Sequence, residues 1–130
     1  MAWEISSTLV ARLLDEAAAS PWVEVCGLLF GTGGRIAAAE ACANVAVEPA
    51  RRFEIDPAAL FAAHRRARAG DAQVIGCYHS HTSGDPVPSA TDAESAMGDG
   101  AIWVILGRGE ARAWRTVERG RFEAVVLSVR

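Results

Sequence analysis

Two of the three histidines in the chain stand two positions apart, a spacing that suits a metal site. The short, largely apolar run at residues 73–78 ends in a polar loop, which predicts a buried strand leading into the first of them. Because successive strand side chains point to opposite faces, His79 and His81 would project from one face and Ser80 from the other. Two imidazoles placed in this way can reach one ion.

The loop after His81 is rich in glycine and proline and leads into a predicted helix that runs from Ser89 to about Met97. Asp92 in this helix could complete a ligand set of two histidines and one carboxylate. Three protein ligands leave a fourth tetrahedral position for water, as in catalytic zinc sites. Ser89 and Asp92 are also typical of a helix N-cap with an acid in the first turn, and the two roles are compatible.

Glu24 is out of place in the run from Trp22 to Gly31, which is otherwise apolar on both faces, as expected for a strand in the middle of a covered sheet. Burying a carboxylate is unfavourable, so a structural role would require a salt-bridge partner, for instance an arginine. The alternative is a general base with a raised pKa. The residues alone leave both interpretations open.

The pattern His-Ser-His, seven residues, Ser, two residues, Asp resembles the JAMM motif of the JAB1/MPN/Mov34 metalloproteases and matches it without a gap. Those proteins carry a catalytic glutamate ahead of a glycine-rich strand end, where Glu24 stands in this chain. The resemblance implies one zinc ion with a bound water, held by His79, His81 and Asp92. It also implies that Glu24 takes the proton of that water and that Ser89 donates a hydrogen bond to the developing oxyanion.

The resemblance further implies a peptidase or isopeptidase that cuts an amide bond at the C-terminus of a ubiquitin-like protein. The chain is short, like compact prokaryotic members that release amino acids or C-terminal extensions from sulfur-carrier proteins, so we expect that substrate class. One alternative is a RadC-type protein associated with DNA repair, since residues 83–89 resemble its loop. Those proteins usually have His-Asn-His and an added N-terminal region. A second alternative, a scaffold that has lost its ligands, is disfavoured by the intact ligand set.

The fold expected from periodicity and resemblance is α/β, a mixed sheet flanked by about three helices in the JAMM or cytidine-deaminase-like layered arrangement. We expect one domain over residues 1–130. The expected helices begin at Ser6 or Ser7 and end at Pro21, run from Asp56 and Pro57 to about Ala69, and follow Ser89. The expected strands are residues 3–5 at a sheet edge, 22–31, 35–42, 73–78 and a final antiparallel meander at 101–106, 112–117 and 122–129.

The composition argues against nucleic acid and membranes as partners. The net charge is −3 and all 13 basic residues are arginine, so there is no broad attraction to anionic surfaces. No uncharged apolar run approaches the ~20 residues of a membrane span, and we expect a cytoplasmic protein. Arginines 65, 66 and 68, together with 51 and 52, are expected to form a solvated face, or alternatively a surface for an acidic partner.

The remaining thiols and imidazole are expected to lie outside the site. Cys26, Cys42 and Cys77 are an odd number with no zinc-ribbon spacing, which favours buried reduced thiols. Cys77 would share a strand face with His79, so a sensing or ligand role is its alternative. His64 is expected on the surface of the second helix, with a fourth-ligand role as the alternative.

Overall fold

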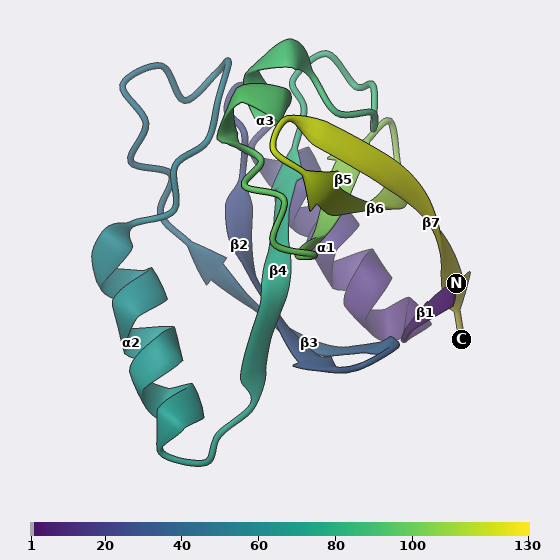
Figure 1. The fold of residues 1–130 in the computed structure, drawn as a ribbon. Helices are drawn as coiled ribbons and strands as arrows, with labels where there is room; N and C mark the ends of the chain where they lie inside the picture. Colours follow the sequence, from purple (N-terminus) through teal and green to yellow (C-terminus); the bar gives the residue numbers. More distant parts are fainter. Residues whose placement is uncertain (1) are drawn as a thin grey trace.

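The computed structural model describes residues 2–130, which form three helices and a seven-stranded mixed sheet that closes on itself (Figure 1). The strands lie in the order β1, β3, β2, β4, β5, β6, β7, and the pairs of β1 with β3 and β7 and of β4 with β5 are parallel. The helices are α1 (Ser7–Ala19), α2 (Pro57–Arg68) and α3 (Ala90–Ser95). The strands are β1 (Ala2–Ile5), β2 (Cys26–Thr32), β3 (Arg35–Cys42), β4 (Gln73–Ser80), β5 (Ile102–Gly107), β6 (Glu110–Glu118) and β7 (Arg121–Val129). The predicted fold class is confirmed.

Helix α1 packs against the inner face of the curved sheet. Its cap is the predicted serine, since the Ser6 side chain accepts a hydrogen bond from the Leu9 amide at 3.0 Å. Leu9 and Leu13, one turn apart, are buried in the main core with residues from every strand. The hydroxyl of Tyr78 on β4 donates to the Glu16 carboxylate at 2.9 Å, and burial together with this bond raises the pKa of Tyr78.

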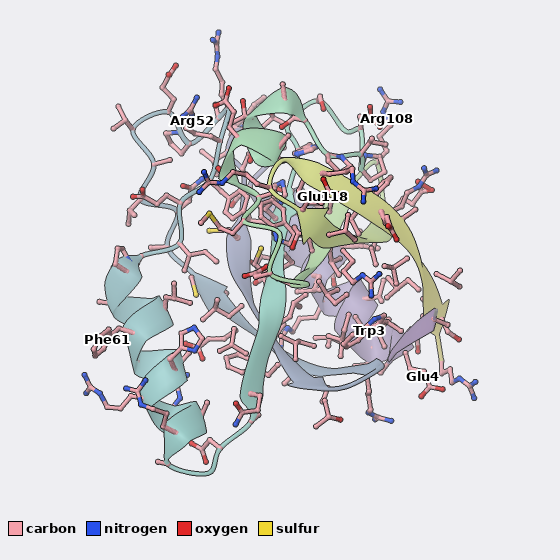
Figure 2. The ribbon with its side chains drawn as sticks, viewed as in Figure 1. Trp3, Glu4, Arg52, Phe61, Arg108 and Glu118 are labelled. Carbon is pink, nitrogen blue, oxygen red and sulfur yellow. The ribbon has the colours of Figure 1, made fainter. Side chains whose placement is uncertain are left out.

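Helix α2 covers the opposite face of the sheet. Asp56 caps it by accepting a hydrogen bond from the Ala58 amide at 3.0 Å, and Pro57 occupies its first position, as predicted. Ala63 packs against Leu28 and Phe30, whereas the intervening Leu29 belongs to the core beneath α1. Strand β2 is therefore covered on both faces, which explains why it is apolar throughout. Figure 2 shows Phe61 on α2 pointing away from the sheet.

Two predictions about the strands were wrong. Residues 3–5 do not lie at an edge, because β1 pairs in parallel with both β3 and β7 and thereby closes the sheet. The strand predicted at 22–31 begins only at Cys26, and Trp22 lies in a turn after α1 with 82% of its surface exposed. The antiparallel meander of β5, β6 and β7 is confirmed.

The positions of the functional candidates follow from the register of β2 and β4. Cys26 at the start of β2 lies opposite His79 near the end of β4, so the segment before β2 reaches the end of the sheet where the histidines stand. Helix α3 and the loop before it lie over the same end of the sheet (Figure 1). Within residues 2–130, no helix is both long enough and apolar enough to cross a membrane.

Candidate metal centre

Side chains from β4 and α3 converge at this end of the sheet. The Nε2 atoms of His79 and His81 lie 3.0 Å apart, and Asp92 Oδ2 lies 3.2 Å from the first and 2.9 Å from the second. His79 belongs to β4, His81 follows the strand directly, and Asp92 stands in the first turn of α3. The structure thus brings together all three predicted ligands, with one potential ligand atom from each facing a common point.

The spacing of these three atoms fits a tetrahedral zinc ion. Ligands at 2.0–2.1 Å from zinc are separated by roughly 3.3–3.4 Å when the angles are tetrahedral. The observed separations of 2.9–3.2 Å are only a few tenths of an ångström shorter. Two imidazole nitrogens and one carboxylate oxygen are also a donor set that catalytic zinc sites use.

The environment favours the metal-binding protonation state of His79 and Asp92, but not that of His81. Burial lowers the pKa of His79, whose side chain is 0% exposed, and so favours neutral imidazole. Burial alone would raise the pKa of Asp92, but hydrogen bonds to both histidines outweigh it and hold that pKa well below its usual range. Burial also disfavours protonated His81, yet the Asp92 carboxylate and the Asp85 carbonyl raise its pKa. A bound cation would displace this proton, because metal binding releases protons from its ligands.

Neighbouring groups hold the two imidazoles in orientation. His81 Nδ1 donates to the Asp85 carbonyl at 2.7 Å, which leaves the lone pair of Nε2 directed at the site. The His79 ring stacks on Phe53 with a centroid separation of 4.2 Å and meets the edge of Trp103 at 5.6 Å. Phe53 and Trp103 were missed from the sequence, since no motif spacing connects a loop residue and a β5 residue to the histidines.

Ser89 and Asp92 form the predicted cap of α3. The Ser89 Oγ accepts from the Asp92 amide at 3.0 Å, and the Ser89 amide donates to Asp92 Oδ2 at 3.0 Å, a reciprocal capping box. The second bond also fixes the carboxylate that faces the histidines. Because Oγ acts as an acceptor here, its own proton is available for donation elsewhere.

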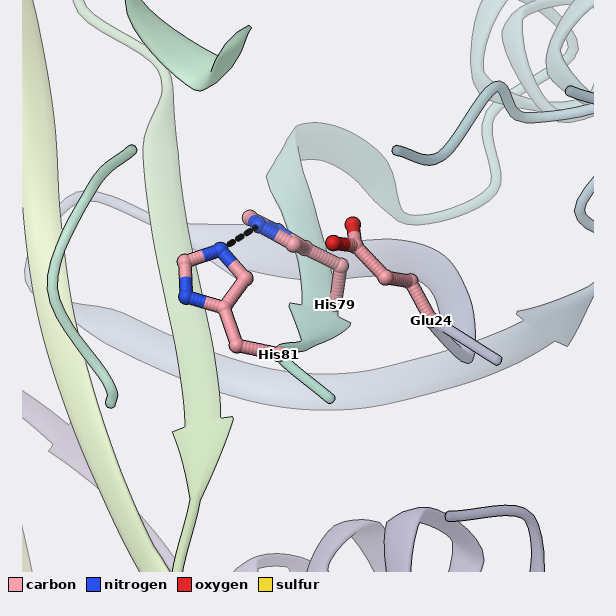
Figure 3. Close-up of side chains that lie close together, drawn as sticks. All are labelled: Glu24, His79 and His81. Atoms are coloured by element: carbon pink, nitrogen blue, oxygen red, sulfur yellow. Dashed lines mark hydrogen bonds between the residues drawn. The ribbon is translucent and has the colours of Figure 1, made fainter. Parts of the chain in front are cut away.

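Glu24 lies just before β2 and is buried, with 5% of its surface exposed. Figure 3 shows its carboxylate on one side of His79 and His81 on the other. Its Oε1 is buried and has no hydrogen-bond partner among residues 2–130. Burial raises the pKa of Glu24 to about 7, although the charges of His81 and Arg52 act in the opposite direction. The salt bridge that a structural role would require is therefore missing from the described part of the chain.

Glu24 and Asp92 are both near enough to compete for the third ligand position. Glu24 can place an oxygen within 4.8 Å of the histidine nitrogens, whereas Asp92 Oδ2 lies within 3.2 Å of both. Direct ligands of one zinc ion must lie about 3.3 Å apart, whereas a base that acts through a water stands farther out. The distances favour Asp92 as the ligand and Glu24 beside the open position.

Comparison with known proteins places this site in a family. Residues 6–117 match the family model described as prokaryotic homologs of the JAB domain. The chain belongs to this family. It is 34% identical over 119 residues to desampylase of Haloferax volcanii, and the alignment covers 88% of this chain and 86% of that protein. It is 33% identical over 119 residues to desampylase of Pyrococcus furiosus, which covers 91% of this chain and 84% of that protein.

Solved structures share the fold of this chain. A protein from Desulfitobacterium hafniense superposes with a TM-score of 0.82 at 20% identity, covering 100% of this chain and 93% of that one. A structure described as JAMM, a metalloprotease-like zinc site in the proteasome and signalosome, gives a TM-score of 0.58 at 17% identity and covers 98% of each chain. The predicted family is confirmed, and the chain is a hydrolytic JAMM enzyme.

Within residues 2–130, the group of potential ligand atoms around the two histidines of this JAMM enzyme includes neither Cys77 nor His64. Cys77 is half-buried beside Phe53 and Trp103 in a cavity of about 500 Å³, and burial raises the pKa of its thiol. His64 is exposed on α2. All three cysteines are free thiols, and Cys26 is the fully buried one, with its pKa raised to about 12 by burial.

Proposed function

We propose that this enzyme is a zinc-dependent peptidase or isopeptidase that cuts an amide bond at the C-terminus of a ubiquitin-like or sulfur-carrier protein in the cytoplasm. One observation carries the proposal. His79, His81 and Asp92 present three ligand atoms 2.9–3.2 Å apart beside the unpartnered carboxylate oxygen of Glu24. The relatives named desampylase support a substrate of the ubiquitin-like class.

The residues divide the reaction between them. Zinc held by His79, His81 and Asp92 would supply a Lewis acid that lowers the pKa of water and polarises a carbonyl group. Glu24 accepts the proton of the attacking water at its free oxygen and returns it to the leaving amine. Burial raises the pKa of this carboxyl group in the zinc-free site, and that direction suits both transfers, because a catalytic acid or base works best when its pKa is near the operating pH.

In this scheme Ser89 donates a hydrogen bond to the developing oxyanion. Its Oγ proton is free to donate because the Asp92 amide already uses Oγ as an acceptor. We expect Ser89→Ala to retain one zinc ion per chain while kcat falls by about 10²–10³-fold, the usual effect of removing one oxyanion donor. Zinc analysis and steady-state kinetics on the same preparation measure both quantities.

The cap of α3 is lost in the same variant, so a matched control is needed. Ser6→Ala removes the corresponding cap of α1, where Ser6 accepts from the Leu9 amide. Each substitution should lower the free energy of unfolding by about 1 kcal/mol, but only Ser89→Ala should affect kcat. Loss of zinc from Ser89→Ala would show that the hydroxyl supports the ligand set and is not a donor to the substrate.

The proposed substrate class can be tested by mass spectrometry. Zinc-loaded protein is incubated with a sulfur-carrier protein that bears a C-terminal extension, beside a Glu24→Gln control, and intact masses are recorded. We expect the added mass to disappear only with the wild type. No cleavage by a zinc-loaded wild type would exclude this substrate class, and a wild type that binds no stoichiometric zinc would instead favour the scaffold alternative.

A further inference from the structure

The side chain of Asn44, between β3 and α2, is the centre of a hydrogen-bond network that includes the backbone of Glu24. Its Nδ2 donates to the Glu24 carbonyl at 2.9 Å, to the Arg52 carbonyl at 3.0 Å and, at a longer 3.5 Å, to the Pro49 carbonyl. Its Oδ1 accepts from the amides of Ala46 and Glu54, each at 3.0 Å. One side chain thus uses its donor and acceptor atoms on backbone groups alone.

This network closes the 45–54 loop (residues 45–54) and joins it to Glu24. The Val45 amide donates to the Glu54 carbonyl at 2.9 Å, and a bridge pairs Asn44 with Ile55 at the base of the loop. The Glu24 amide donates to the Pro49 carbonyl at 2.7 Å. Glu24 is therefore held through both its backbone N–H and its backbone C=O by this one loop and its anchor.

Glu24 needs such support because the sheet does not supply it. Strand β2 starts at Cys26, so no ladder bond reaches Glu24, and the buried Oε1 has no partner among residues 2–130. A carboxylate that acts as a base needs at least one oxygen that is not engaged in a structural hydrogen bond. Its position must then come from its backbone and from packing.

We propose that Asn44 is the residue that positions Glu24 for proton transfer, acting through the Glu24 backbone and the 45–54 loop. The inference rests on the proposed role of Glu24 as the base. Asparagine suits the task because its amide combines two N–H donors with an acceptor that has two lone pairs. Aspartate would instead place a charged oxygen against the carbonyls of Glu24 and Arg52. The loop also lines the cavity beside His79, where Phe53 stacks on the imidazole ring.

The test replaces Asn44 by Asp, which keeps the acceptor of the Ala46 and Glu54 amides but abolishes donation to the Glu24 carbonyl. In the zinc-loaded protein, amide hydrogen exchange at Glu24, followed by NMR, should accelerate by about tenfold or more as local opening becomes easier. Exchange at Val25 should stay unchanged, because its amide donates to Ser80 Oγ at 2.9 Å. With substrate, kcat should fall by about 10–100-fold while KM changes by less than about threefold.

Thr82→Val is the matched control, because Thr82 Oγ1 donates to the Ala50 carbonyl at 2.9 Å and forms the second tether of the same loop. It should leave exchange at Glu24 as in the wild type. Unchanged Glu24 exchange in Asn44→Asp, or a defect confined to KM, would overturn the inference. A wild type that cleaves no carrier protein would refute the proposed function, and the exchange comparison would still decide whether Asn44 holds Glu24. If Asn44→Asp does not fold, Asn44→Ser serves in the same comparison.

Discussion

Glu24→Gln is expected to bind one zinc ion per chain with wild-type stoichiometry and to lose about 10²–10⁴-fold in kcat, the usual contribution of a positioned general base. The amide has nearly the shape of the carboxylate but cannot accept the proton of the attacking water. Zinc stays because His79, His81 and Asp92 form the close triangle of ligand atoms, whereas Glu24 stands outside it. Metal analysis beside single-turnover kinetics separates binding from chemistry.

A stability measurement on the zinc-free protein provides a readout that does not depend on substrate. Burial raises the pKa of Glu24 from 4.5 to about 7. A carboxyl group with a raised pKa contributes stability below its unfolded pKa, and this contribution is lost as the pH rises through the folded value. Zinc-free Glu24→Gln should therefore lose less stability than the wild type between about pH 4.5 and 7. If the free energy of unfolding had the same pH dependence in both proteins, Glu24 would not be buried as described.

The convergence of the proposed ligands was predictable from the sequence because the geometry that produces it is local. Alternation along β4 places His79 and His81 on one side, and a capping pattern fixes Ser89 and Asp92 at the start of α3. Each of these relations spans a few residues. The position of Glu24 was predicted only in part, since hydrophobicity alone does not show that the strand ladder begins two residues later at Cys26.

The features that the sequence did not reveal depend on contacts between distant segments. Asn44 bonds to the backbone at Glu24, and backbone groups carry no sequence signal. Phe53 stacks on His79 from an irregular loop whose course depends on that same network. The closure of the sheet through β1 joins the two ends of the chain by parallel pairing, and a strand of four residues gives too little pattern to predict its partners.

Loss of the third ligand is the other large effect expected. Asp92→Ala should weaken zinc binding by on the order of 10²-fold or more, because even outer-shell partners of a metal contribute 10–100-fold. The reason is geometric as well as electrostatic. Asp92 Oδ2 is held at 3.0 Å from the Ser89 amide while it faces both imidazoles, so the carboxylate is already oriented before an ion arrives. Two histidines alone would leave half of a tetrahedral shell to water.

Thermal unfolding with and without zinc measures this effect independently of any substrate. An ion that binds only the folded protein stabilises it by about 2.7 kcal/mol at a hundredfold excess over Kd, so the Tm of the wild type should rise on adding zinc. The Tm of Asp92→Ala should not rise at the same zinc concentration. Glu94→Ala removes an exposed acid from the same helix and should respond like the wild type. A zinc response that survives in Asp92→Ala but disappears in Glu24→Ala would transfer the ligand role to Glu24, leaving the enzyme without the free base that the reaction needs.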